Sequence, residues 1–100
     1  MPEINLSIPH FLTMEEALHR MKNLISDLRI RYAEQIEDAH ESWTMNQANI
    51  DLTVRGAKAS GTLTVEEATV LIVLKYPFVL FPLHSRIERY IREEAEALLK

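Results

Sequence analysis

The chain of 100 residues has no cysteine and only two glycines, and each scarcity excludes a class of protein. Without cysteine there is no disulfide framework and no cysteine-based zinc site, which fits a reducing compartment. Two glycines cannot build a glycine-rich phosphate-binding loop. The longest apolar stretch, residues 68–83, is interrupted by Lys75 and two prolines. It is therefore too short and too broken for a transmembrane helix, which needs about 20 apolar residues.

The rest of the composition is that of one ordinary globular domain. Apolar residues make up 47% of the chain and charged residues 26%, which argues against disorder. The length predicts a single domain, residues 1–100. The first residues show no positively charged segment followed by an apolar one, so we expect no secretory signal and a cytoplasmic location.

The charge distribution argues against nucleic acid as a partner. The formal net charge is −4, and phosphate backbones repel such a surface unless a local basic patch overrides the total. Basic residues do gather near the C-terminus, but glutamates alternate with them: Arg86, Glu88, Arg89, Arg92, Glu93, Glu94 and Glu96. We therefore expect no nucleic-acid binding.

The N-terminal third predicts a strand followed by a helix. Residues 4–8 alternate between apolar and polar side chains, which is typical of a short strand, and Pro9 ends it. Apolar residues then recur at helical spacing over 14–34, which predicts one continuous helix. Thr13 and Glu16 form the sequence pattern of a capping box at its start.

Four more strands follow, separated by short turns. Alternating or β-branched segments predict strands at 39–44, 48–54, 59–65 and 68–75. The turns between them are expected at 46–47, 56–58 and 66–67. Connections this short join antiparallel neighbours, so the four strands should form a meander.

The C-terminal third predicts an apolar connector, residues 76–81, and a second helix that begins at Pro82. The element order is then β-α-β-β-β-β-α. Each predicted helix has one apolar stripe and most strands have one apolar face. This pattern predicts an α+β domain in which two helices pack on one face of an antiparallel sheet.

The last strand is apolar on both faces. Its residues at 70, 72 and 74 are expected to face the helices, which leaves two apolar side chains beside threonines on the opposite face. Covering each large side chain is worth about 1.5–3 kcal/mol, so a group of them is not expected in water. Either the connector completes the core, or part of this surface contacts a partner, for which a homodimer is the expected form. The candidate interaction surface is Leu71, Val73, Tyr76, Phe78, Val79 and Phe81.

No catalytic or metal-binding constellation is evident in the sequence. Two Glu-x-x-His pairs, at 16–19 and 37–40, match the half-sites of di-iron bundles, but the second lies at a predicted strand. His10 and His84 are predicted to have structural or surface roles. We therefore expect no catalytic residue, no metal and no cofactor. An enzyme acting on acyl thioesters stays open, and it would need histidines gathered in an apolar pocket.

Several segments resemble the polyhydroxyalkanoic acid system family, short bacterial proteins encoded near genes for polyhydroxyalkanoate synthesis and granules. The segments are Ile8-Pro9-His10-Phe11-Leu12, Gly61-Thr62-Leu63-Thr64-Val65, Phe78-Val79-Leu80, Arg86-Ile87-Glu88-Arg89-Tyr90-Ile91 and Leu98-Leu99. The resemblance covers nearly the whole chain. Leu83-His84 stands where members of the family tend to have a Phe-Lys pair, which weakens the inference of a shared partner surface.

The resemblance implies a cellular context rather than a chemical activity. It suggests a non-enzymatic accessory protein of polyhydroxyalkanoate granules or their synthesis machinery, acting through the apolar interaction surface. Its partner would be the granule surface or a granule protein, and its location the granule. The alternative is a small carrier that binds an apolar or hydroxyacyl ligand between the sheet and the C-terminal helix.

Overall fold

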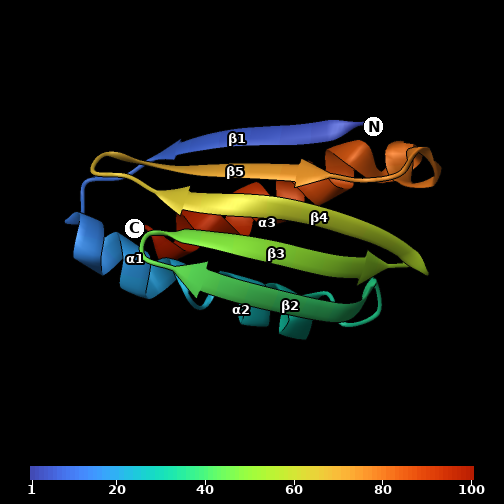
Figure 1. The fold of residues 1–100 in the computed structure, drawn as a ribbon, viewed down its shortest axis with the longest axis horizontal. Helices are drawn as coiled ribbons and strands as arrows, with labels where there is room; N and C mark the ends of the chain where they lie inside the picture. The colour runs from blue at the N-terminus through green and yellow to red at the C-terminus, as the bar shows by residue number, and fades with distance from the viewer.

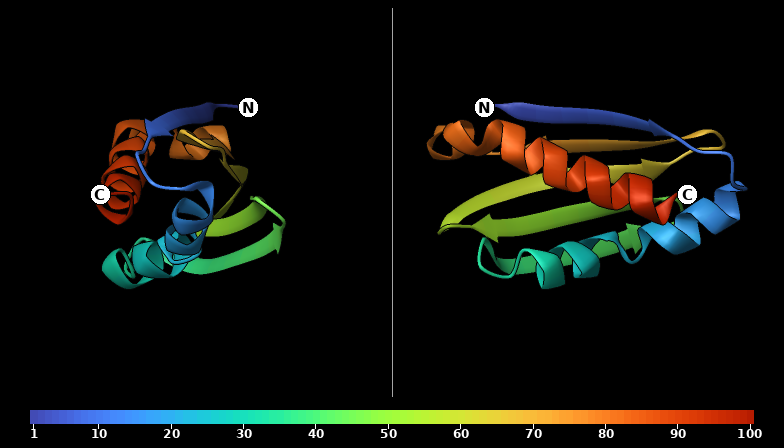
Figure 2. Two further views of the ribbon diagram at one scale, coloured as in Figure 1. Left: turned by 90° about the vertical axis from the view of Figure 1, so that its left-hand side faces the viewer. Right: turned by 180° about the vertical axis from the view of Figure 1, so that it is seen from behind.

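The computed structural model describes residues 1–100 as a five-stranded antiparallel sheet with helices on one face (Figure 1; Figure 2). The elements are β1 (Glu3–Pro9), α1 (Met14–Met21), α2 (Leu24–Arg31), β2 (Ile36–Thr44), β3 (Gln47–Val54), β4 (Ala57–Val65), β5 (Thr69–Lys75), the 3₁₀ helix η1 (Phe78–Leu83) and α3 (His84–Leu98). The strand order is β1-β5-β4-β3-β2, so β2 to β5 form the predicted meander and β1 pairs with β5. The predicted α+β class is confirmed.

The core lies between the sheet and the helices, and strand alternation decides which side chains enter it. In the two adjacent strands β1 and β5, every second residue is buried: Ile4, Leu6, Ile8, Val70, Ile72 and Leu74. The register places Ile4 beside Leu74 and Ile8 beside Val70, so both strands turn the same face to the helices. Burial of each such side chain contributes about 1.5–3 kcal/mol. The other face of the sheet carries no helix (Figure 2).

Two tight hairpins fix the register of the meander. Arg55 and Gly56 both have positive φ, 50° and 79°, as a two-residue type I′ turn requires. The β2–β3 turn likewise has Met45 at φ 55°, followed by Asn46. Both turns begin one residue earlier than predicted, because strand pairing resumes immediately after the second turn residue.

The predicted first helix is divided into two, so the expectation of one continuous helix over 14–34 is wrong. The helix α1 ends at Met21 and α2 begins at Leu24. Between them, Asn23 has a low helix propensity, and its N–H bonds to the carbonyl of Arg20, three residues back, at 3.1 Å. Met21 and Leu24 are both buried, so the break changes the helix direction without losing the apolar stripe. It lets the chain follow a twisted sheet, as Figure 2 shows.

The start of α1 is joined to the C-terminus of the chain. Thr13 caps the helix by accepting a hydrogen bond from the N–H of Glu16 at 3.1 Å. The return half of the capping box is replaced, because the Glu16 carboxylate pairs with Arg20 at 3.0 Å. Arg20 also donates to the carbonyl oxygens of Leu98 and Lys100. These bonds close the end of the helix layer where α1 meets the end of α3, which we call the closed end (Figure 1).

The apolar connector is a 3₁₀ helix rather than a simple loop. Pro77, with extended φ and ψ of −74° and 156°, precedes η1, and Pro82 lies inside η1. The predicted second helix corresponds to α3, which begins at His84 rather than at the predicted Pro82. No helix of the structure has both the length and the apolar composition that a membrane span requires.

Candidate functional site

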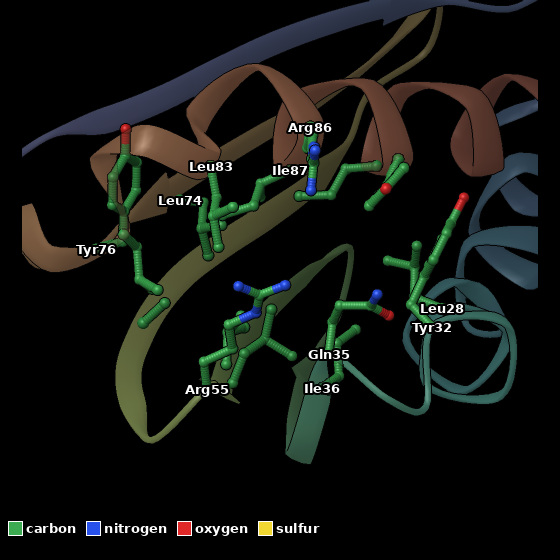
Figure 3. A pocket seen from close by; sticks show the side chains of 16 residues that line it. Leu28, Tyr32, Gln35, Ile36, Arg55, Leu74, Tyr76, Leu83, Arg86 and Ile87 are labelled. Carbon is green, nitrogen blue, oxygen red and sulfur yellow. The ribbon is translucent and has the colours of Figure 1, made fainter.

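An apolar cleft opens between the sheet and α3, at the end opposite the closed end (Figure 3). Its cavity volume is about 60 Å³, and 13 of its 16 lining residues are hydrophobic. The lining side chains come from α2, β2, β3, β4, β5, η1, α3 and the segments that connect them: Leu28, Tyr32, Gln35, Ile36, Leu52, Val54, Arg55, Ala59, Leu74, Tyr76, Leu80, Leu83, Arg86, Ile87, Tyr90 and Ile91. We call this end of the molecule the open end.

One wall of the cleft is fixed by contacts between α2 and α3. The rings of Tyr32 and Tyr90 stack with centroids 4.1 Å apart and planes within 16° of each other. Beside this stack, Arg31 forms an ion pair with the nearly buried Glu94, at 3.2 Å. Aromatic stacking of this kind is worth about 0.5–1.5 kcal/mol beyond its buried area. Both contacts hold α2 and α3 together, so this wall is built into the packing of the two helices.

Tyr76 belongs to the core, which corrects its prediction as a surface residue. Its side chain is 0% exposed, and its hydroxyl hydrogen-bonds to Nδ1 of His84. Nε2 of His84 lies 3.4 Å from a carboxylate oxygen of Glu88, one turn further along α3. Burial raises the pKa of the Tyr76 phenol. The hydroxyl points away from Arg55 and Gln35 (Figure 3), so this chain of groups anchors η1 and β5 to α3.

Three other predicted surface residues are exposed on η1. Phe78 is 74% exposed, Val79 is 73% exposed and Phe81 is 57% exposed. A 3₁₀ helix has three residues per turn, so side chains three apart share one side. Leu80 and Leu83 accordingly line the cleft, while Phe78 and Phe81 lie on another side of η1. We call the exposed group Phe78, Val79 and Phe81 the apolar tip.

The remaining predicted surface residues lie on the sheet rather than at the tip. Leu71 and Val73 are half-buried on the face without helices. Their cross-strand neighbours are polar: Ser7 and Thr64 beside Leu71, and Asn5 and Thr62 beside Val73. The six predicted residues therefore do not form one surface. Tyr76 is buried, three residues form the apolar tip, and Leu71 and Val73 are half-buried among polar neighbours.

The histidines are not gathered in one pocket. His10 is buried, donates from Nε2 to the carbonyl of Glu66 at 3.0 Å, and accepts at Nδ1 from the N–H of Leu12 at 3.2 Å. His40 is exposed and bonds to Asp38 at 3.0 Å, and this hydrogen bond lowers the pKa of the Asp38 carboxyl. His10 thus joins two loops at the closed end. No group of three or more His, Asp or Glu side chains is placed to hold a metal ion.

Three polar residues at the cleft were not predicted from the sequence to be site residues. Arg55 lies in the β3–β4 turn, Arg86 in the first turn of α3 and Gln35 before β2. No motif links positions 35, 55 and 86, because they are brought together only when the meander and α3 pack. The sequence indicates their proximity only indirectly, because it predicts a hairpin turn and the start of α3 at the same end of the sheet.

The fold and the site define a small α+β domain with a one-sided sheet, an apolar cleft and an exposed apolar tip. Residues 4–99 match the family model PHA_gran_rgn, described as "putative polyhydroxyalkanoic acid system protein". The chain belongs to this family, which confirms the resemblance found in the sequence. The comparison with curated proteins gives no significant match.

Proposed function

We propose that this protein is a non-enzymatic accessory of polyhydroxyalkanoate granules in the cytoplasm, which attaches through its apolar tip. Its family membership provides the polyhydroxyalkanoate context. The observation on which the proposal rests is the exposure of three large apolar side chains at one point, Phe78, Val79 and Phe81. Their common target would be a hydrophobic polyester surface or a granule protein.

The anchoring of η1 supports this role. Leu80 is buried, and the Tyr76–His84 hydrogen bond ties the connector to α3 on the inner side. The tip therefore presents its aromatic rings on a fixed backbone, which lowers the entropy lost on contact with a surface. Each ring removed from water would contribute about 1.5–3 kcal/mol.

The test is adsorption of purified protein to amorphous polyhydroxyalkanoate particles. Replacing both tip rings, Phe78→Ser with Phe81→Ser, should abolish adsorption. The matched control is Phe11→Ser, because Phe11 is also exposed but lies away from the tip, in the β1–α1 loop. Equal adsorption of the tip variant and the wild type would contradict the proposal. So would recovery of the wild type only from the soluble fraction of granule-producing cells.

The same tip is the expected contact of a homodimer. Light scattering of the wild type and the tip variant separates this possibility from granule attachment. A dimer that the tip variant converts to monomers would assign the tip to self-association. A wild-type monomer that adsorbs to particles would leave the tip free for the granule.

A second candidate function, a small carrier, is favoured by the cleft between the sheet and α3. Thirteen of its sixteen lining residues are hydrophobic, as expected for a site that takes an apolar chain. Native mass spectrometry with short-chain and medium-chain acyl compounds tests this function. The absence of any bound species, with the protein folded, would reject it.

A further inference from the structure

We propose that the cleft binds a carboxylate with an unbranched acyl chain, and that Arg55 and Arg86 together hold the carboxylate. The inference rests on the carrier function above and specifies the chemical class of the ligand. Three features of the cleft support it: both arginines line it, neither has an acidic partner, and the apolar space below them has room for a few carbon atoms.

The two arginines reach the cleft from opposite sides. Arg55 is held at the hairpin turn between β3 and β4 with φ 50°, on the sheet side. Arg86 lies in the first turn of α3, on the helix side. Figure 3 shows both guanidinium groups facing the space between helix and sheet, with the amide of Gln35 on the same side as Arg55.

Neither guanidinium is neutralised within the protein. Of the five other arginines, Arg20, Arg29, Arg31 and Arg92 pair with carboxylates at 4 Å or less, and Arg89 lies against the ring of Tyr90. Arg55 and Arg86 form no ion pair, although the chain has 15 acidic residues for 11 basic ones, and no Asp or Glu lines the cleft. Both arginines are exposed at the mouth of the cleft, so an anion from solvent can reach them. A carboxylate suits this position because guanidinium groups bind it with two parallel hydrogen bonds.

The apolar space beneath the arginines determines which uncharged chain the ligand can carry. Leu74, Leu83 and Ile87 form part of an apolar lining that an uncharged chain can contact. The cavity volume of about 60 Å³ is several times the roughly 10–15 Å³ that one water molecule needs. It therefore takes the few terminal carbon atoms of an unbranched chain, and the carbons nearest the carboxylate would lie in the open mouth.

The experiment is a titration of the ¹⁵N-labelled full chain with sodium octanoate, followed by amide chemical shifts. Saturable shifts are expected at cleft residues, with a Kd on the order of 10⁻⁴–10⁻³ M for a ligand of this size. Arg55→Gln and Arg86→Gln should each raise the Kd about tenfold. The control is Lys58→Gln, which removes an exposed charge beside the same hairpin without touching the cleft lining, and it should leave the Kd unchanged. The spectrum of each variant verifies that it is folded.

Two further probes separate this inference from the carrier function. If 1-octanol binds as tightly as octanoate and the arginine variants bind both normally, the cleft is a carrier site without head-group recognition, and the inference is wrong. If neither compound shifts cleft residues, the carrier function and the inference both fail. If inorganic phosphate binds the arginines as tightly as octanoate does, the acyl chain contributes nothing and the inference is again wrong. Preferential octanoate binding that depends on both arginines supports it.

Discussion

Both ends of the helix layer are lined mainly by apolar side chains, but one end is closed and the other is open. At the closed end, Ala17, Met21 and Ala95 have no exposed surface, and His10 links two loops through its ring. At the open end, the same sheet and the same helix α3 leave an apolar cleft and three exposed large side chains. The difference lies in the helix layer, because α1 packs against the end of α3 at one end, whereas at the other end a space stays open between α2, α3 and the sheet (Figure 2). Apolar composition alone therefore does not determine what is core and what is surface.

The largest expected effect tests whether the closed end is the better packed. Met21→Ala should lower the free energy of unfolding by about 2–5 kcal/mol, because it leaves a cavity among fully buried neighbours. Ile87→Ala at the open end should cost less, about 1–2 kcal/mol, because Ile87 is half-buried beside a space that already exists. Urea unfolding measures both. Equal losses would show that the two ends are packed alike.

A second substitution tests the sheet that both ends share. A methyl group at Gly61 would overlap the backbone carbonyl oxygen of Val73 in the neighbouring strand. Gly61→Ala should therefore cost about 1–3 kcal/mol by pushing β5 away from β4. The other glycine provides the comparison: Gly56→Ala meets no atom within 4 Å but has φ 79°, so it should cost about 1 kcal/mol. A smaller loss of stability at Gly61 than at Gly56 would show that β5 moves away from β4 at little cost. Amide exchange in β5 would then be fast.

The third prediction concerns the anchor of the open end. Tyr76→Phe removes a buried hydroxyl and its bond to His84, which should cost about 1 kcal/mol at neutral pH. Burial raises the pKa of Tyr76 above its ordinary value of 10.0, so the unfolded chain loses the proton first. The contribution of Tyr76 is therefore complete below pH 10 and is lost as the pH rises through the higher folded pKa. Urea midpoints from pH 8 to 11 should fall more steeply for the wild type than for Tyr76→Phe. Parallel curves would contradict the assigned burial.

Strand periodicity predicted the sheet well where one face of a strand is buried. The alternation of residues 4–8 and 48–54 specified which side chains enter the core, and both segments are strands with that burial. The break at Asn23 was missed, because the apolar stripe continues across it and the twist of the sheet is not encoded in any short window.

The candidate site was only partly predictable. The segment from Tyr76 to Phe81 is apolar throughout, so its composition could not tell the buried Tyr76 and Leu80 from the exposed Phe78 and Phe81. That choice depends on the 3₁₀ geometry of η1 and on the hydrogen bond to His84. The arginines of the cleft are 31 positions apart in sequence and become neighbours of one space only after α3 packs on the sheet.

The smallest expected effect on stability is at the apolar tip. Phe78→Ser with Phe81→Ser should change the free energy of unfolding by no more than about 0.5 kcal/mol per site, because both rings already face solvent. Leu80→Ala, between them on the buried side of η1, should cost about 2–5 kcal/mol. Thermal unfolding of the two variants therefore measures how sharply η1 divides core from surface. A large loss in the double tip variant would mean that the rings are covered in solution, most simply by a second copy of the chain. That loss would then depend on protein concentration, because dissociation is coupled to unfolding in a dimer.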